Sequence, residues 1–228
     1  QEQTQLGDRL PWAINHLFER LLQATRDYQL QYDIGLQIQH LICDIRILWA
    51  RGYTRKCRTY LRKAERLARR YQRDAQLLEI LEWQRKVEVK EQNKGHTERF
   101  RKAVGAKNEA LDRLNVRFQA LDLRQELLLQ SRQQSDLARI APELPSFLSH
   151  CDFRTRHEQL FARAIAAQIR GQYPAAHGHY AEMLAHFQAH PDFRWLLQRD
   201  YILILNNYLN LAHATGKYDR FVELLSEL

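Results

Sequence analysis

Turn-forming residues are scarce in this sequence. It contains eight glycines and five prolines among 228 residues, roughly half the share of an average protein. No proline lies between Pro11 and Pro142. β-Sandwiches, β-barrels and glycine-rich nucleotide-binding folds need more turn residues than this. Hydrophobic residues at 45% and charged residues at 27% are ordinary values for a folded domain, which excludes disorder as the main state. The composition therefore predicts an all-α protein.

Cysteine and long apolar runs are also scarce. Cys43, Cys57 and Cys151 are too few and too far apart for a disulfide framework or a CxxC metal site. No apolar run approaches the ~18 residues that cross a bilayer, and no signal peptide is recognisable. We therefore expect a reduced, cytoplasmic protein without a membrane partner. Because the chain starts at Gln1 instead of Met and stops at Leu228 inside a helical pattern, we expect a piece of a longer protein.

Apolar residues recur with a helical period along most of the chain. The expected helices cover about residues 8–30, 32–50, 53–72, 74–92, 96–132, 155–170, 175–189, 192–215 and 218–228. They group into a first repeat-like pair at 32–72, a long helical hairpin at 74–132, an irregular connector at 133–154 and C-terminal repeats at 155–228. We expect consecutive helices to pack as antiparallel pairs in a single repeat region, residues 1–228.

The segment 96–132 has a heptad-like seam of apolar residues. The seam consists of Phe100, Val104, Leu111, Leu114, Phe118, Leu121 and Leu128. The preceding helix is about half as long, so it can cover only part of this seam. We expect the remainder to contact either a second copy of the chain, in a homodimer formed through the 96–132 helix, or residues 135–150 of the same chain.

Positive charge is concentrated between residues 51 and 73, which hold ten basic residues and one acidic residue, Glu65. Six of the arginines recur at three- and four-residue spacing, which places them on one side of a helix: Arg55, Arg58, Arg62, Arg66, Arg69 and Arg73. Two interpretations remain open. The arginines form a solvated face whose long side chains cover apolar surface, or they contact phosphate groups or an acidic partner, since guanidinium groups bind such anions through paired hydrogen bonds.

A short pattern recurs at three glycines, each preceded by an apolar helix. It consists of Gly171, Tyr173, Ala176 and Tyr180, of Gly216, Tyr218, Phe221 and Leu225, and, with a threonine in place of the aromatic residue, of Gly52, Cys57 and Leu61. The glycine permits a tight turn between two helices. We expect the aromatic residue to pack into that turn and the two later residues to close the helix pair.

This pattern resembles the second helix of the tetratricopeptide repeat, most closely at residues 171–180. The resemblance covers about residues 32–72 and 155–228, although the 45 residues from Gly171 to Gly216 exceed the usual 34-residue unit. Over its whole length the chain looks like uncharacterised tetratricopeptide-like proteins of bacteria. The resemblance implies an α-solenoid that binds peptides or partner proteins on its concave face without catalysis.

No motif for catalysis is present. The phosphate-binding patterns GxGxxG and GxxxxGK[ST] and the nucleophile pattern GxSxG do not occur. His157 and Glu158 begin like a zinc-protease helix, but Phe161 stands where the second ligand is needed. His186 and His190, four residues apart, lack a cysteine or an acidic ligand on the same turn. We expect no catalytic residue, no cofactor and no physiological metal site.

The leading hypothesis for function is a non-enzymatic scaffold that binds another protein or peptide of unknown identity. The recognised pattern is structural throughout, and the charge outside residues 51–73 is nearly balanced. The alternative is a nucleic-acid or phosphate-binding module that uses the arginine-rich helix. A regulator that senses a small molecule or peptide is a third hypothesis. Salt dependence separates the first two, since phosphate contacts weaken steeply as salt rises.

Overall fold

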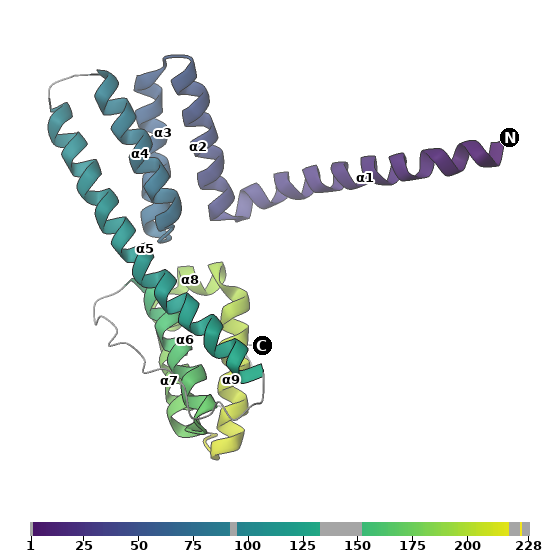
Figure 1. Ribbon diagram of the computed structural model, residues 1–228, viewed down its shortest axis with the longest axis vertical. Coiled ribbons are helices and arrows are strands. Elements are labelled where there is room, and N and C mark those ends of the chain that lie inside the picture. Colours follow the sequence, from purple (N-terminus) through teal and green to yellow (C-terminus); the bar gives the residue numbers. More distant parts are fainter. Residues whose placement is uncertain (1, 92–94, 133–151, 219–223, 225–228) are drawn as a thin grey trace. The chain divides into compact units, whose positions relative to one another are not determined.

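A computed structural model describes residues 2–91, 95–132, 152–218 and 224, and every regular element in these ranges is an α-helix (Figure 1). The helices are α1 (Glu2–Tyr32), α2 (Ile34–Ala50), α3 (Thr54–Arg70), α4 (Asp74–Glu91), α5 (His96–Arg132), α6 (Phe153–Ile169), α7 (Tyr173–Ala189), α8 (Pro191–Leu196) and α9 (Gln198–Thr215). The all-α prediction is confirmed. The expected connector lies outside the described residues except for its last part, where Asp152 caps α6.

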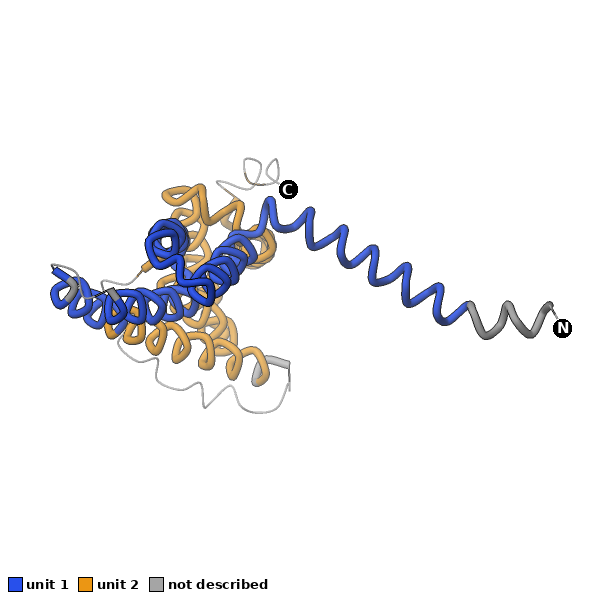
Figure 2. Tube along the Cα trace, turned by 90° about the horizontal axis from the view of Figure 1, so that it is seen from above, with its two compact units in different colours: residues 1–107 blue, residues 108–228 orange. Residues whose placement is uncertain are grey.

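The chain divides into two compact units, residues 1–107 and 108–228 (Figure 2). The boundary falls inside α5, so each unit contains part of that helix. In the first unit α2, α3 and α4 pack side by side as successive antiparallel neighbours. In the second unit α7 packs against both α6 and α9. The consecutive helices α2, α3 and α4, and likewise α6 and α7, are therefore neighbours in space, as expected for antiparallel pairs.

Small side chains on α3 build the core of the first unit. Cys57, Ala64 and Ala68 are fully buried and Leu61 is nearly so, and together they form the inward face of this helix. Side chains of this size let two helices approach closely, and α3 packs against α2 on one side and α4 on the other. The larger core residues come from those neighbours: Ile38, Ile42, Ile45, Leu77, Ile80 and Leu81. Each such side chain contributes roughly 1.5–3 kcal/mol on full burial.

Aromatic residues connect the helices in the core of the second unit. Phe153 of α6 stacks on Phe193 of α8 with ring centroids 4.2 Å apart, and its edge contacts Phe187 of α7. Tyr180 of α7 is 1% exposed. Its hydroxyl group donates to Gln168 at 3.1 Å and accepts from Asn207 at 3.3 Å. This hydroxyl therefore ties α7 to α6 and α9, and burial raises its pKa to about 12.

The predicted glycine turns are present in all three places. Gly52, Gly171 and Gly216 have φ angles of 77°, 70° and 70°, in the left-handed region that glycine adopts without strain. At each turn the next N–H group bonds to the carbonyl five residues earlier, which is the Schellman motif. A fourth turn of this kind lies between α3 and α4, where Gln72 has a φ of 51°. No glycine marks that turn in the sequence.

The other residues of the repeated pattern differ in how deeply they are buried. Cys57, Leu61, Ala176 and Tyr180 are buried and close their helix pairs as predicted. Tyr173 and Tyr218 are 48% and 49% exposed, so they do not pack into the turns. Tyr173 begins α7, and at the start of a helix the side chain points back over the turn. Two further pattern residues, Phe221 and Leu225, lie outside the described residues.

We expect replacing Gly171 by Ala to lower the free energy of unfolding of the second unit by about 1 kcal/mol. The cause is the left-handed φ of 70°, because a Cβ at this position meets no atom within 4 Å. Gly178 is the matched control: it also has open space for a Cβ but lies inside α7. Gly178→Ala should stabilise the unit by about 0.5–1 kcal/mol. Urea unfolding of both variants tests this, and a change of the same sign in both would contradict it.

The structure corrects two helix boundaries. The single helix expected at 192–215 is wrong, because the chain leaves helical geometry at Leu197 and forms α8 and α9. This break accompanies the packing of Phe193 onto Phe153, a contact distant in sequence that periodicity cannot reveal. The first helix begins at Glu2, so Pro11 lies inside it instead of in its first turn. A proline removes one intrahelical bond, and the helix continues through it.

The predicted seam of α5 is not its most buried side. Ala103 in the first unit and Ala110, Ala120 and Leu127 in the second are at most 6% exposed. Leu111 and Phe118 of the predicted seam are 43% and 50% exposed. The remaining five seam residues are half-buried: Phe100, Val104, Leu114, Leu121 and Leu128. Periodicity selects the largest apolar residues, whereas alanines permit the closest approach of a neighbouring helix. Pairing of two copies through α5 stays a prediction.

Candidate anion-binding groove

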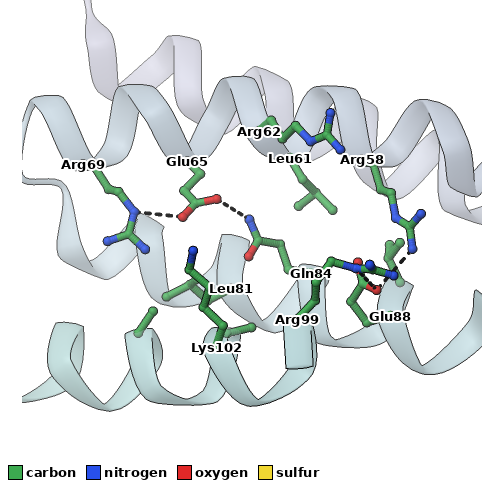
Figure 3. A pocket seen from close by; sticks show the side chains of 13 residues that line it. Arg58, Leu61, Arg62, Glu65, Arg69, Leu81, Gln84, Glu88, Arg99 and Lys102 are labelled. Atoms are coloured by element: carbon green, nitrogen blue, oxygen red, sulfur yellow. Dashed lines mark hydrogen bonds and ion pairs between the residues drawn. The ribbon is translucent and has the colours of Figure 1, made fainter. Parts of the chain in front are cut away.

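Three helices of the first unit line a groove of about 380 Å³ (Figure 3). The lining residues are Arg58, Leu61, Arg62, Glu65 and Arg69 from α3, Leu81, Gln84, Val87 and Glu88 from α4, and Arg99, Lys102, Ala103 and Ala106 from α5. Leu61, Leu81, Val87 and Ala103 are buried and form an apolar floor. Charged side chains form the rims, so the groove combines apolar surface with groups that bind anions.

The helical period explains why these side chains meet. Arg58, Arg62, Glu65 and Arg69 follow one another at four, three and four residues, which places them on one side of α3. Residues 81, 84 and 88 of α4 and 99, 102 and 106 of α5 repeat the same spacing. Each helix therefore turns one continuous stripe toward the groove.

Glu88 is the centre of the ion pairs at one end of the groove. Its side chain is 9% exposed and its Oε2 atom accepts from Arg58 at 3.2 Å and from Arg99 at 2.8 Å. Three helices thus meet at one carboxylate, as the dashed lines in Figure 3 show. A nearly buried carboxylate needs such partners, because an isolated buried charge is costly. Arg58 and Arg99 are therefore partly neutralised and fixed in position.

Glu65 organises the other end of the groove. One of its carboxylate oxygens accepts from Arg69 Nε at 2.8 Å, and the other accepts from Gln84 Nε2 at 2.6 Å. The Arg69 pair joins residues four apart on α3, and the Gln84 bond joins α3 to α4. Both bonds hold Glu65 across the groove instead of out in solvent.

Arg62 and Lys102 are the two cations that these carboxylates leave unneutralised. Both are exposed, and neither forms an ion pair with another residue in the ranges that the structure describes. The groove lining contains five cationic side chains and two carboxylates. Its positive excess therefore resides chiefly in Arg62 on the α3 rim and Lys102 on the α5 rim, which Figure 3 shows on opposite sides of the apolar floor.

The structure separates the six predicted arginines into three groups. Arg58, Arg62 and Arg69 line the groove. Arg55 and Arg66 are exposed on α3 but do not line it. The placement of Arg73 on the same stripe is wrong, because α3 ends at Arg70 and the left-handed Gln72 redirects the chain.

Arg99 and Lys102 of α5 were missed by the sequence reasoning. Both lie within three residues of each other, in the first two turns of a helix expected to return along α4. Packing the two helices of the predicted hairpin, residues 74–132, side by side would have placed these cations near the arginines of α3. Which of them meets Glu88 depends on the rotation of α5 about its axis, and the apolar pattern of α5 misplaces that rotation by about one residue.

The histidines His186 and His190 are held by aromatic and backbone contacts. The ring of His186 stacks on Phe153 at 4.3 Å, and its Nε2 atom lies 3.4 Å from the Phe153 carbonyl oxygen. His190 Nδ1 lies 3.0 Å from the His186 carbonyl oxygen. Among the described residues no three His, Cys, Asp or Glu side chains gather as a metal site would require. The described helices also include none with the length and apolarity needed to cross a bilayer.

A second concentration of titratable groups lies in the core of the other unit. His157 is 2% exposed, and neither of its ring nitrogens has a hydrogen-bond partner among the described residues. Burial, with a smaller contribution from Arg124, lowers the pKa of His157 to about 3. Its neighbour Glu158 has a raised pKa, again chiefly because of burial, although Arg124 pairs with it at 2.8 Å. These groups face the protein interior, so they affect stability instead of lining a binding site.

No protein-family model, no curated protein and no solved structure matches this chain.

Proposed function

We propose that this chain is a non-enzymatic interaction module that binds an acidic segment of a partner protein in the groove between α3, α4 and α5. The observation that carries the proposal is the meeting of five cationic side chains from two helices over an apolar floor. Acidic side chains of a partner pair with Arg62 and Lys102, and its apolar side chains cover Leu61, Leu81 and Val87.

The repeated glycine turns support the architectural part of this proposal. The connections α2–α3 and α6–α7 and the end of α9 share the same left-handed glycine and the same Schellman bonds. Such a repeat is characteristic of tetratricopeptide-like α-solenoids, whose role is to bind proteins or peptides. We therefore assign the two helix stacks to that class as part of the proposal.

The carboxylates of the groove favour an acidic peptide over a nucleic acid. Glu65 and Glu88 lie among the cations, and both repel a phosphate backbone that follows the arginine stripe. A peptide can alternate its charges and apolar side chains to match the lining, whereas a phosphate backbone carries one charge at every step. Nucleic-acid binding is the second candidate function, and it predicts an affinity that falls more steeply as the salt concentration rises.

The test uses a fluorescein-labelled peptide that alternates glutamate with leucine, read by fluorescence anisotropy. Arg62→Glu combined with Lys102→Glu should weaken binding at least about tenfold, because two close charge pairs become repulsive. The matched control combines Lys63→Glu with Arg101→Glu. These residues are the exposed neighbours on the same two helices, and they do not line the groove. The control has the same net charge and should stay within about twofold of the unmodified protein.

Three results would contradict the proposal. Equal weakening in both double variants would show attraction to net charge alone. Absence of binding to the peptide at millimolar concentration would show that the groove does not take acidic peptides. Tighter binding of a DNA or RNA duplex, with affinity falling steeply from about 50 to 200 mM salt, would favour the nucleic-acid module instead.

A further inference from the structure

Helix α1 carries an apolar seam that no other described part of the chain covers. Leu10, Ile14, Leu17, Leu21 and Tyr28 are between 57% and 65% exposed. Together with Ala24 they follow one another at four, three, four, three and four residues. Phe18, which is 64% exposed, and Leu22 flank the seam. The stripe therefore runs along most of a 31-residue helix.

The spacing of the seam indicates what kind of surface can cover it. Apolar residues that alternate at three and four residues have a period of 3.5, which matches a second helix wound around the first. A flat surface or a globular pocket imposes no such period over almost three heptads. The occupant is therefore a helix with an apolar stripe of similar length.

The charges beside the seam favour a second copy of α1 as that helix. Between residues 10 and 32 the charged side chains are Glu19, Arg20, Arg26 and Asp27, which balance one another. Two neutral copies do not repel each other. An anionic lipid surface attracts basic amphipathic helices and gains little from this one. The same neutrality separates α1 from the basic groove, whose partner must be acidic.

The area of the seam is sufficient for a stable pair. An aliphatic side chain whose burial contributes ~1.5–3 kcal/mol corresponds to roughly 60–120 Å², and an aromatic one buries more. The five aliphatic and two aromatic side chains of the seam and its flank together offer roughly 500–900 Å² per copy. Stable interfaces bury about 800 Å² on each partner. We propose that two copies of this chain associate through α1, with residues 10–28 of one helix packed along residues 10–28 of the other.

The experiment is multi-angle light scattering of the full 228-residue chain at micromolar concentration. We expect a mass twice the 27.2 kDa of one chain. Leu17→Gln combined with Leu21→Gln should convert it to a monomer, because polar side chains then occupy the centre of the seam. Trp12→Gln is the matched control. It removes an apolar side chain that is 69% exposed on α1 but lies off the seam, and it should leave the dimer intact.

Circular dichroism at the helix band confirms that the double variant keeps its fold, which is expected because these side chains contact little else. A monomeric unmodified chain would overturn the proposal. A dimer that survives Leu17→Gln with Leu21→Gln would also overturn it. Adding Phe118→Gln to that double variant then tests whether the exposed side of α5 is the contact instead.

Discussion

Replacing Asp152 by Ala is expected to lower the free energy of unfolding of the second unit by about 3–5 kcal/mol. Its carboxylate accepts the Thr155 N–H at 2.9 Å, which caps α6. The same carboxylate accepts from Arg117 Nη2 at 3.1 and 3.0 Å. The Asp152 and Arg117 side chains are only 11% and 14% exposed. The substitution therefore removes the cap and leaves a mostly buried guanidinium without this counter-charge.

Asp33→Ala is the matched control for Asp152→Ala. Asp33 caps α2 in the same way, by accepting the Leu36 N–H at 3.0 Å, but its side chain is exposed and forms no ion pair with the described residues. Loss of this cap alone should cost about 1 kcal/mol. Native-state hydrogen exchange measures the stability of each unit separately, from amides in α6 and α7 for Asp152→Ala and from amides in α2 and α3 for the control. Equal effects at the two positions would show that the Arg117 pair contributes nothing beyond the cap.

Acidification from about pH 7 to about pH 5 is expected to destabilise the second unit by about 2 kcal/mol through His157 alone. Burial lowers the folded-state pKa of His157 from 6.5 to about 3. The unfolded chain therefore binds a proton that the folded protein does not. The loss of stability begins as the pH falls through 6.5 and continues until about pH 3, where the folded state also protonates.

Other groups around His157 modify this pH dependence. The pKa values of His177, His179 and His186 are also lowered, in each case chiefly by burial, and they act in the same direction as His157. The raised pKa of Glu158 acts in the opposite direction, because its folded-state carboxyl group takes up a proton above its ordinary value of 4.5, before the unfolded chain does. The carboxylate of Asp200 lies 3.9 Å from His157 Nε2, too far for a hydrogen bond that would favour the charged form.

His157→Leu should remove most of the His157 contribution and make the second unit more stable at both pH values. A buried polar ring with two unpaired nitrogens costs about 1–3 kcal/mol relative to an apolar side chain of similar size. Gln159→Leu is the matched control, because Gln159 is buried on the same helix and does not titrate. Its substitution should shift stability equally at both pH values. Urea unfolding that shows the same pH slope for His157→Leu and the unmodified protein would contradict the prediction.

The helices and many of their connections could be predicted from the sequence because they depend on local interactions. The apolar period places α2, α3 and α5 within two residues of their observed ends. Glycine marks three of the left-handed turns, since it alone adopts a positive φ without a steric penalty. The turn at Gln72 uses a residue that pays that penalty, so no sequence signal marks it.

The candidate groove could be predicted only in part. The spacing of arginines on α3 placed Arg58, Arg62 and Arg69 on one side of a helix, as the structure has them. The spacing did not show that these arginines differ in how far they are neutralised, because that difference depends on carboxylates of other helices. Glu88 of α4 neutralises Arg58, and Arg99 of α5 shares that carboxylate. A spacing pattern describes one helix, whereas neutralisation depends on which side chains of other helices lie within reach.

Local sequence patterns are enough to establish the helical class, the order of the helices, the inward face of α3 and the concentration of positive charge. Each of these follows from interactions between residues a few positions apart, which the linear order contains directly. Contacts between helices, by contrast, determine that α5 buries its alanines, that the chain breaks at Leu197, and that Arg62 and Lys102 line the same groove. These features arise from contacts between helices, and such contacts depend on the rotation and separation of helices that no local period specifies.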